Sequence, residues 1–267
     1  MEDLKGKTIG IVGAGAIGGA VIDRLLNGGD VAPSMIVACE KDEARRAVVA
    51  QRFGVRITSE VSQSAAADLV VLAVPPPEAL GVLAQVAGPT RPRAVIVSFA
   101  AAVPLASLET ALAGKCPVVR VNPNSPSLVG HGFNPVAWGR GFTDDERALA
   151  ECFLALLGNS VEVPDEQMNL YTALTAVGPT YFLPVFEAMI AAGTERGLTG
   201  DAALRAAVET ARGTAALVAN RPEAPEALKL YTGLRPLSDD TVRKLVADAV
   251  DDAFGRMTGA QKNIVGS

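Results

Sequence analysis

Three glycines near the N-terminus have a spacing that is typical of dinucleotide binding. A short apolar run at residues 8–12 ends in these glycines, and a helical pattern follows. Gly13 permits a tight turn, Gly15 lets the backbone approach a pyrophosphate, and Gly18 lets the helix pack closely on the strand. The first N–H groups of that helix would face the anion. The pattern predicts a nicotinamide or flavin dinucleotide and, with it, redox chemistry.

An acidic residue follows the second expected strand, 35–39. Glu40 lies about 20 residues after the glycine turn, where a carboxylate can accept hydrogen bonds from both ribose hydroxyls. That position favours NADH over NADPH. Lys41, Arg45 and Arg46 follow closely, and a basic cluster could instead hold a 2′-phosphate. We therefore expect NAD(P)H, with NADH favoured by Glu40, and the choice between the two stays open.

The composition argues against several other classes of protein. With 267 residues, 49% of them apolar, the chain can form one large or two modest domains. A net charge of −5 gives no electrostatic support to a nucleic-acid partner. The three cysteines, Cys39, Cys116 and Cys152, form no close pair, which favours a reducing compartment without disulfides or a metal site. No signal peptide is evident and no uninterrupted apolar run reaches ~18 residues, so we expect a cytoplasmic protein without a membrane partner.

Alternating strands and helices must position the glycine turn and Glu40. Strands are expected near 8–12, 35–39, 55–57, 69–74, 94–98 and 118–121, and helices near 16–27, 42–53, 60–66, 78–86 and 104–113. Repeated βα units predict a parallel sheet with right-handed crossovers, and ligands bind at the carboxyl ends of such strands. The glycine turn, Glu40, residues 74–77 and residues 98–101 should therefore line one crevice.

Cofactor contacts are expected from the strand ends around this crevice. Asn122 ends the strand at 118–121 and could orient the nicotinamide amide; its alternative role is turn formation, which asparagine serves well. The residues expected to contact the cofactor are Gly13, Gly15, Ala16, Ile17, Gly18, Glu40, Ala73, Val74, Pro75, Ala100 and Asn122.

Helical patterns dominate the second half of the chain. Thr143 and Glu146 have the spacing of a capping box and predict a helix start. Further helices are expected at 166–197, 200–220 and 238–257, with Pro179 and Pro184 bending or breaking the first of them. Many small residues in this half would allow close helix approach, as in dimerisation units.

These patterns define the expected architecture. The fold class is α/β, with an N-terminal Rossmann-type doubly wound parallel sheet and a C-terminal all-helical part. We expect a dinucleotide-binding domain at 1–163 and a helical dimerisation and substrate domain at 164–267.

Several segments carry a family resemblance. They are IGIVGAGAIGGA at 9–20, DLVVLAVPP at 68–76, VIVSFAAAVPLASLE at 95–109, VVRVNPNSPSLVGHG at 118–132 and TALTAVGPTYF at 172–182. With them the chain resembles the pyrroline-5-carboxylate reductase family, whose patterns include an Asn-Thr-Pro-like turn, Val-Gly-Glu-Gly and Gly-Ser-Gly-Pro-Ala-Tyr. Gly178, Pro179 and Tyr181 match the last pattern, whereas His131 replaces the glutamate of the second. The resemblance implies a homodimer or higher homo-oligomer that reduces a cyclic imine such as 1-pyrroline-5-carboxylate with NAD(P)H.

The chain departs from the family at the loop that holds the substrate carboxylate. The family has Ser-Pro-Gly-Gly-Thr-Thr after a Leu-Lys step, whereas Leu228 and Lys229 are followed here by LYTGLRPLSDD. Arg235 in the altered loop could replace the lost backbone contacts by a bidentate contact to a carboxylate. Asn124 and Tyr171 are the other expected substrate contacts.

An imine reductase needs few catalytic groups, because the cofactor supplies the hydride. A protonated imine is a good electrophile, so a proton donor and a dry pocket suffice. His131, Thr175 and Tyr181 are the expected catalytic donors, with Tyr171 as a further candidate. His131, which titrates near neutral pH, could instead be a solvent-exposed loop residue, and Tyr181 could simply pack between helices.

Two other functions fit the same scaffold. The first is a dehydrogenase or reductase of a keto or hydroxy acid. The related β-hydroxyacid dehydrogenases use a lysine early in their helical domain, and this chain has no lysine between Asp144 and Leu228. The second is a non-catalytic dinucleotide-binding regulatory protein, for which the altered loop is the support.

Overall fold

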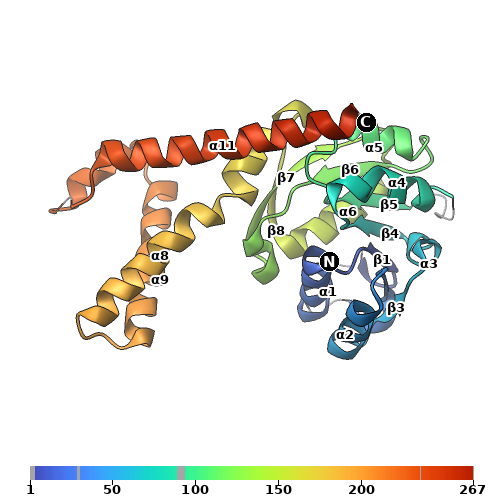
Figure 1. Ribbon diagram of the computed structural model, residues 1–267, viewed down its shortest axis with the longest axis horizontal. Coiled ribbons are helices and arrows are strands. Elements are labelled where there is room, and N and C mark those ends of the chain that lie inside the picture. Colours follow the sequence, from blue (N-terminus) through green and yellow to red (C-terminus); the bar gives the residue numbers. More distant parts are fainter. Residues whose placement is uncertain (1–3, 29–30, 89–93, 235, 267) are drawn as a thin grey trace. The chain divides into compact units, whose positions relative to one another are not determined.

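A computed structural model describes residues 4–28, 31–88, 94–234 and 236–266 (Figure 1). Contacts between Cα atoms divide the chain into two compact units, residues 1–177 with 252–267, and residues 178–251. Compact units are not the same as functional domains, so the domain boundary expected after residue 163 stays a prediction.

The first unit contains an eight-stranded sheet. Its strands are β1 (Ile9–Val12), β2 (Ile36–Cys39), β3 (Arg56–Thr58), β4 (Leu69–Leu72), β5 (Val95–Ser98), β6 (Val118–Val121), β7 (Gly132–Trp138) and β8 (Gly158–Glu162). They lie in the order β3-β2-β1-β4-β5-β6-β7-β8, and the pairs among β1 to β6 are all parallel. The expected parallel Rossmann-type sheet is confirmed.

Helices cover both faces of this sheet (Figure 1). They are α1 (Ala16–Asn27), α2 (Glu43–Phe53), α3 (Val61–Ala65), α4 (Pro76–Val86), α5 (Leu105–Ala111) and α6 (Asp144–Leu157). One buried cluster packs α1 and α6 on the sheet, and a second cluster packs α3, α4 and α5 on it. Residues of β1, β4 and β5 contribute to both clusters, which explains why these strands are apolar at successive positions.

Strand β7 is a finding that the sequence pattern did not predict, because it runs antiparallel to β6. The chain reverses through a 3₁₀ turn, η3 (Ser125–Val129), and Gly130 has a left-handed φ of +75°. This connection contains no crossover helix, so only an antiparallel return is possible. Strand β8 then pairs parallel with β7 after the crossover by α6. The capping box at the start of α6 is confirmed: Thr143 and Glu146 exchange side chain to backbone hydrogen bonds.

The remainder of the described chain is mostly helical. Its elements are η2 (Pro33–Met35), η4 (Asp165–Gln167), α7 (Met168–Tyr171), a π-helical turn (Thr172–Ala176), α8 (Pro179–Glu195), α9 (Gly200–Asn220), α10 (Pro225–Leu228), η6 (Lys229–Tyr231) and α11 (Asp239–Val265). Pro179 is the first residue of α8, whereas Pro184 lies inside it. The end of α11 belongs to the first unit, where the Asn169 side-chain amide donates to Gln261 Oε1 at 2.7 Å.

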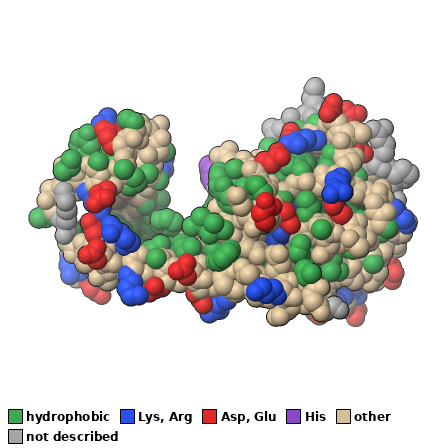
Figure 2. All heavy atoms as spheres, turned by 90° about the horizontal axis from the view of Figure 1, so that it is seen from above, with side chains coloured by type: hydrophobic (Ala, Val, Ile, Leu, Met, Phe, Trp, Pro, Cys, Tyr) green, Lys and Arg blue, Asp and Glu red, His purple; other side chains and the backbone are tan. Residues whose placement is uncertain are grey.

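The second unit leaves many large apolar side chains at its surface (Figure 2). They include Phe182, Leu183, Val185, Leu204, Val208 and Leu245, each more than two-fifths exposed. Measured by mean hydropathy instead of uninterrupted apolar runs, the helical stretch 165–195 is long and apolar enough to cross a membrane. Of the apolar window that meets this test, 11% is buried inside the protein. Length and composition alone are weak evidence for a membrane span, because helices of soluble proteins pass the same test.

Candidate active site

A cavity of about 620 Å³ lies where β1, β2, β4 and β5 end. All four segments expected to form one crevice contribute to its wall. The lining residues include Gly13, Gly15, Ala16, Ile17, Glu40, Lys41, Arg45, Ala73, Val74, Pro75, Phe99 and Ala101. Its volume is within the range of small-molecule and cofactor sites.

The glycine turn forms one wall of this cavity, and each glycine is required for a different reason. Gly13 has a φ of +95°, and a Cβ there would lie 2.6 Å from the carbonyl oxygen of Ala73. A Cβ on Gly18 would overlap the carbonyl oxygen of Gly13. At Gly15, in contrast, the nearest atom to an added Cβ is Arg45 Nη1 at 3.8 Å, so a ligand can approach the backbone.

The N-terminus of α1 faces the same cavity. Gly15 is its N-cap residue and makes no side-chain capping bond, and Ala16 and Ile17 line the wall. Within the described residues, no capping side chain accepts from the first N–H groups of α1. An uncapped helix N-terminus beside an open glycine fits a pyrophosphate, which would satisfy these donors and the positive end of the helix dipole.

Glu40 lies beside the glycine turn and is only 5% exposed. Its Oε1 accepts from the backbone N–H of Asp42 at 3.0 Å, and its Oε2 accepts from Arg45 Nη1 at 3.3 Å. Arg46 donates to the carbonyl oxygens of Glu40 and Lys41, so its guanidinium stabilises the backbone of the loop after β2. Among these basic groups Arg45 therefore directs its charge at the carboxylate and at the approach to Gly15.

An ion pair forms part of the cavity wall. Lys41 Nζ lies 2.8 Å from Glu78 Oε2 and connects the end of β2 to the first turn of α4. Both residues line the cavity, and both are largely exposed. The pair lies on the same side of the cavity as Glu40, where the adenosine half of a dinucleotide would bind.

The end of β5 forms the other side. Phe99 and Ala101 line the cavity, whereas Ala100, an expected cofactor contact, is 1% exposed, belongs to a buried apolar cluster and is not among the lining residues. Asn122 is also buried; its side-chain amide donates to Thr172 Oγ1, and its Oδ1 has no partner in the described part of the chain. Asn122 therefore holds the helical segment after η4 and does not line the cavity.

The expected proton donors are in different environments. His131 is exposed in the turn before β7 and lines none of the cavities described here. Thr175 is half-buried in the π-helical turn, where its hydroxyl donates to the carbonyl oxygen of Tyr171 at 2.8 Å. Tyr181 belongs to the second compact unit, and Arg235 lies outside the described residues. Within the first unit the structure does not bring His131 and Thr175 to the wall of the cavity.

A buried ion pair behind the site was missed by the sequence reasoning. Arg120 on β6 is fully buried and donates from Nη1 to Asp165 Oδ1 at 2.7 Å. Asp165 Oδ2 also accepts from the N–H of Leu105 at the start of α5. Burial lowers the pKa of Arg120, with the Asp165 carboxylate opposing that shift. The signal was present in the sequence, because an arginine within the apolar run 118–121 must find a partner.

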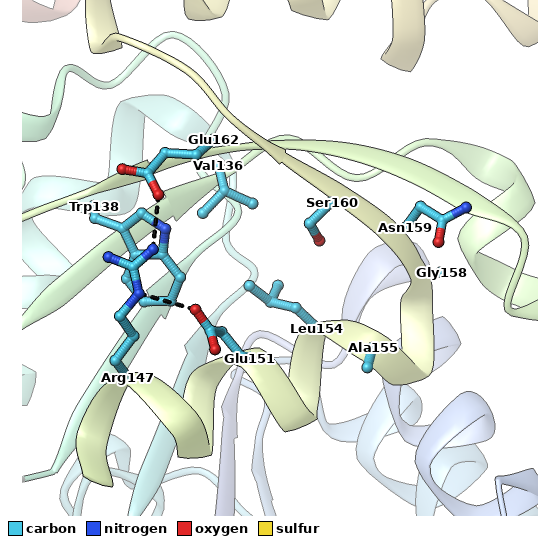
Figure 3. Close-up of a pocket in the computed structure, with 10 residues that line it drawn as sticks. All are labelled: Val136, Trp138, Arg147, Glu151, Leu154, Ala155, Gly158, Asn159, Ser160 and Glu162. Carbon is cyan, nitrogen blue, oxygen red and sulfur yellow. Dashed lines mark hydrogen bonds and ion pairs between the residues drawn. The ribbon is translucent and has the colours of Figure 1, made fainter. Parts of the chain in front are cut away.

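Another cavity of about 340 Å³ lies between β7, β8 and α6 (Figure 3). Arg147 lines one end of it, with its guanidinium 4.4 Å from the centre of the Trp138 ring and paired with Glu151 and Glu162. Hydrogen bonds that Arg147 donates to the Glu151 and Glu162 carboxylates raise the pKa of Arg147. Its charge is thus satisfied within the protein. In the described ranges no group of three or more His, Cys, Asp and Glu side chains could hold a metal ion.

Two sequence families match this chain. Residues 8–102 match the family described as NADP oxidoreductase coenzyme F420-dependent, and residues 165–259 match the family described as Pyrroline-5-carboxylate reductase dimerisation. The second match covers the helical segments that expose large apolar side chains.

Individual relatives extend the similarity over most of the chain. A pyrroline-5-carboxylate reductase of Corynebacterium melassecola is 31% identical over 260 residues, which are 95% of each chain. That of Mycobacterium leprae is 35% identical over 218 residues, covering 80% of this chain and 74% of the relative.

Solved structures show the same fold. Plasmodium falciparum pyrroline carboxylate reductase with NADP bound has a TM-score of 0.83 at 19% identity, covering 96% of this chain and 99% of that one. The reductase of Coxiella burnetii has a TM-score of 0.78 at 24% identity, covering 96% and 99%. The identities over most of the chain, together with the dimerisation match, show that the chain belongs to the pyrroline-5-carboxylate reductase family, whose members are NAD(P)-dependent oxidoreductases that act on a CH–NH group.

Proposed function

We propose that this protein reduces the C=N bond of a cyclic imine, such as 1-pyrroline-5-carboxylate or a related imino acid, with NAD(P)H. The observation that carries the proposal is the open glycine turn and uncapped N-terminus of α1 in a cavity of about 620 Å³. These features lie in a chain whose C-terminal half matches the dimerisation segment of imine reductases.

The protein's part in the reaction is to bind, to orient and to exclude water. The bound cofactor supplies a hydride. Backbone N–H groups from Gly15 to Ile17 would hold the pyrophosphate, and Val74 and Pro75 would cover the cofactor from the end of β4. The apolar side chain of Phe99 lines the side of the cavity at β5, where it would exclude water and strengthen the interaction between a charged imine and the groups around it.

Within the NAD(P)H pair, we propose that Glu40 favours NADH. Its buried carboxylate is fixed by the Asp42 N–H and keeps one oxygen for a partner, at present Arg45. Ribose hydroxyls can donate to that oxygen, whereas a 2′-phosphate would meet a negative charge. Because Arg45 is half-exposed and neutralises part of that charge, we expect NADPH to be used less well instead of being rejected.

His131, Thr175 and Tyr181 remain the proposed proton donors, and Asn124, Tyr171 and Arg235 the proposed substrate contacts. Each donor is tested by a change that removes the proton and keeps the shape: His131→Asn, Thr175→Val and Tyr181→Phe. A general acid contributes about 10²–10⁴-fold to a rate. A donor is identified by a fall of kcat of that size with the dissociation constant of NADH unchanged; a change under about threefold removes the residue from the list.

We further propose that the functional unit is a cytoplasmic homodimer, or a higher homo-oligomer, formed through the helical domain at 164–267, and that it has neither a nucleic-acid nor a membrane partner. The exposed side chains of α8, α9 and α11 support this, because contiguous apolar surface of this kind is typical of subunit interfaces. Light scattering on the purified protein tests it: a monomer at micromolar concentration would contradict the proposal.

The proposed activity is tested with five- and six-membered cyclic imino acids and with NADH and NADPH in parallel, following cofactor oxidation. We expect turnover of at least one imine and none without imine. NADH binding without oxidation on any imine would overturn the proposal in favour of a regulatory protein. Oxidation only with keto acids would overturn it in favour of the other redox chemistry.

A further inference from the structure

A second pocket, of about 320 Å³, adjoins the cofactor cavity. The two share Ala16, Ile17 and Phe99 as lining residues, so they are immediate neighbours. The second pocket extends from the exposed side of α1 to the turn that follows β6. All its lining residues belong to the first compact unit.

The wall of this pocket is largely apolar. Its hydrocarbon side is formed by Ala16, Ile17, Ala20, Val21, Phe99, Pro123, Leu128 and Leu157, and its other lining residues are Asn124, Ser125 and Ser127. None of these residues carries a charge. A carboxylate moved into this pocket would lose its water shell and gain no cation, which is strongly unfavourable.

Two of the three polar lining residues use their side-chain oxygens in bonds within the protein. Ser127 Oγ donates to Asn134 Oδ1 at 2.9 Å, and the backbone N–H of Phe133 donates to Asn124 Oδ1 at 3.3 Å. Both bonds hold the η3 turn against the start of β7. Ser125 is the remaining polar side chain, and it is exposed. With no charged residue in its lining and mostly apolar side chains, the pocket favours an uncharged group.

The direction of the dinucleotide places this pocket at the reacting end of the cavity. Glu40 marks the adenosine ribose at the end of β2, and the N-terminus of α1 marks the pyrophosphate. The half of the cofactor that carries the hydride must then extend away from Glu40, towards β5 and β6. The second pocket begins at Phe99, at the end of β5, and continues to Pro123 and Asn124, just beyond β6.

We propose that this pocket binds an uncharged hydrocarbon part of the imine substrate, and that Leu128 is a residue that determines substrate specificity. The inference rests on the proposed imine reduction and names the class of substrate: cyclic imines that carry an alkyl or aryl group. A carboxylate, where the substrate has one, is held outside this pocket.

The side chain of Leu128 gives the cleanest test. It is 51% exposed and lines only the second pocket, so its truncation leaves the core and the cofactor cavity intact. Val129, the next residue, is 68% exposed and lines neither cavity, which makes Val129→Ala a matched control. Leu128→Gln keeps the length of the side chain and adds polarity.

The experiment measures kcat/KM for 1-pyrroline, 2-methyl-1-pyrroline and 2-phenyl-1-pyrroline, beside 1-pyrroline-5-carboxylate. For the native protein we expect kcat/KM to rise from the unsubstituted to the phenyl compound. Leu128→Ala and Leu128→Gln should lower the value for the phenyl compound about tenfold and that for 1-pyrroline less than about twofold, since apolar contact with the phenyl group is lost in the first variant and made polar in the second. Val129→Ala should change none of them.

The outcomes separate this inference from the proposed function. No turnover of any imine, with NADH still bound, is a failure of the proposed function. Turnover of imines with equal losses for all four compounds, or with no loss in either Leu128 variant, overturns the pocket assignment alone. A Leu128 variant that changes the oligomeric state but not the order of preference overturns it as well, because the pocket would then be covered by a second copy of the chain.

Discussion

The two sides of the cofactor cavity are built in different ways. On the glycine side the backbone itself forms the wall, and at Gly13 and Gly18 there is no room for a single added carbon. On the side of β5 the wall includes the side chain of Phe99, and at β6 Arg120 binds Asp165 and Asn122 binds Thr172, which hold the segment leading to Tyr171 and Thr175. A backbone wall can be recognised from glycine spacing, whereas a side-chain wall depends on contacts between segments far apart in the sequence. This difference explains why the cofactor half of the site is better defined than the substrate half.

Removing the Asp165 carboxylate should have the largest effect on the side-chain wall. Asp165→Ala leaves Arg120 buried with no ionic partner, and breaking a buried pair in this way costs about 3–5 kcal/mol of unfolding free energy. Urea denaturation measures it. Glu162→Ala is the control, because it breaks an exposed pair with Arg147 and should cost less than about 1 kcal/mol. Similar losses in the two variants would mean that Arg120 finds another partner.

On the backbone wall, Gly18→Ala and Gly15→Ala should separate stability from binding. A methyl group on Gly18 overlaps the Gly13 carbonyl, so we expect a loss of about 1–3 kcal/mol in unfolding free energy. Gly15→Ala has open space and should change stability by less than about 0.5 kcal/mol. Its methyl group faces the approach of the pyrophosphate, so the dissociation constant of NADH should rise about tenfold, or about 1.4 kcal/mol. A destabilised Gly15→Ala variant that still binds NADH normally would contradict this division of roles.

The specificity for the cofactor should respond more weakly to changes at Glu40 and Arg45. Glu40→Gln removes the charge that a 2′-phosphate would meet, and Arg45→Ala removes the charge that offsets it. We expect the ratio of NADPH to NADH dissociation constants to fall about fivefold in the first variant and to rise by a similar factor in the second, from about 1 kcal/mol of charge interaction. Arg52→Ala, on the same helix, is the control. Equal ratios in all variants would remove both residues from cofactor selection.

The difference between the backbone wall and the side-chain wall also explains which features could be predicted from the sequence. The strands β1, β4, β5 and β6 were predicted because their apolar runs are buried on both faces. Strand β7 was missed because GFNPVAW contains a glycine, an asparagine and a proline, and because its direction depends on the reversal at Gly130. The segments that form the cofactor cavity were predicted, since parallel strands end at one edge. The role of Asn122 could not be predicted, because its side chain binds Thr172, fifty residues later in the sequence, and does not line the cavity.

Cys39 should show the smallest effect, a change in the reactivity of its thiol. It is the last residue of β2, directly before Glu40, and it lines the cofactor cavity beside the glycine turn. Burial raises the pKa of the Cys39 thiol, and the nearby Glu40 carboxylate raises it further. The thiolate is the reactive form, so at any pH below that pKa less of it is present than in the unfolded chain. We expect alkylation of Cys39 by iodoacetamide at pH 8 to be slower in the folded protein than in denaturant, and the difference to shrink as the pH rises. Peptide mass spectrometry measures both rates.

Because Cys39 is 5% exposed, restricted access also slows the reaction, but that effect is the same at every pH. A rate ratio that does not change with pH would therefore show that access alone protects Cys39 and that Glu40 exerts no charge effect on it. Glu40→Gln should bring the folded rate closer to that of the unfolded chain.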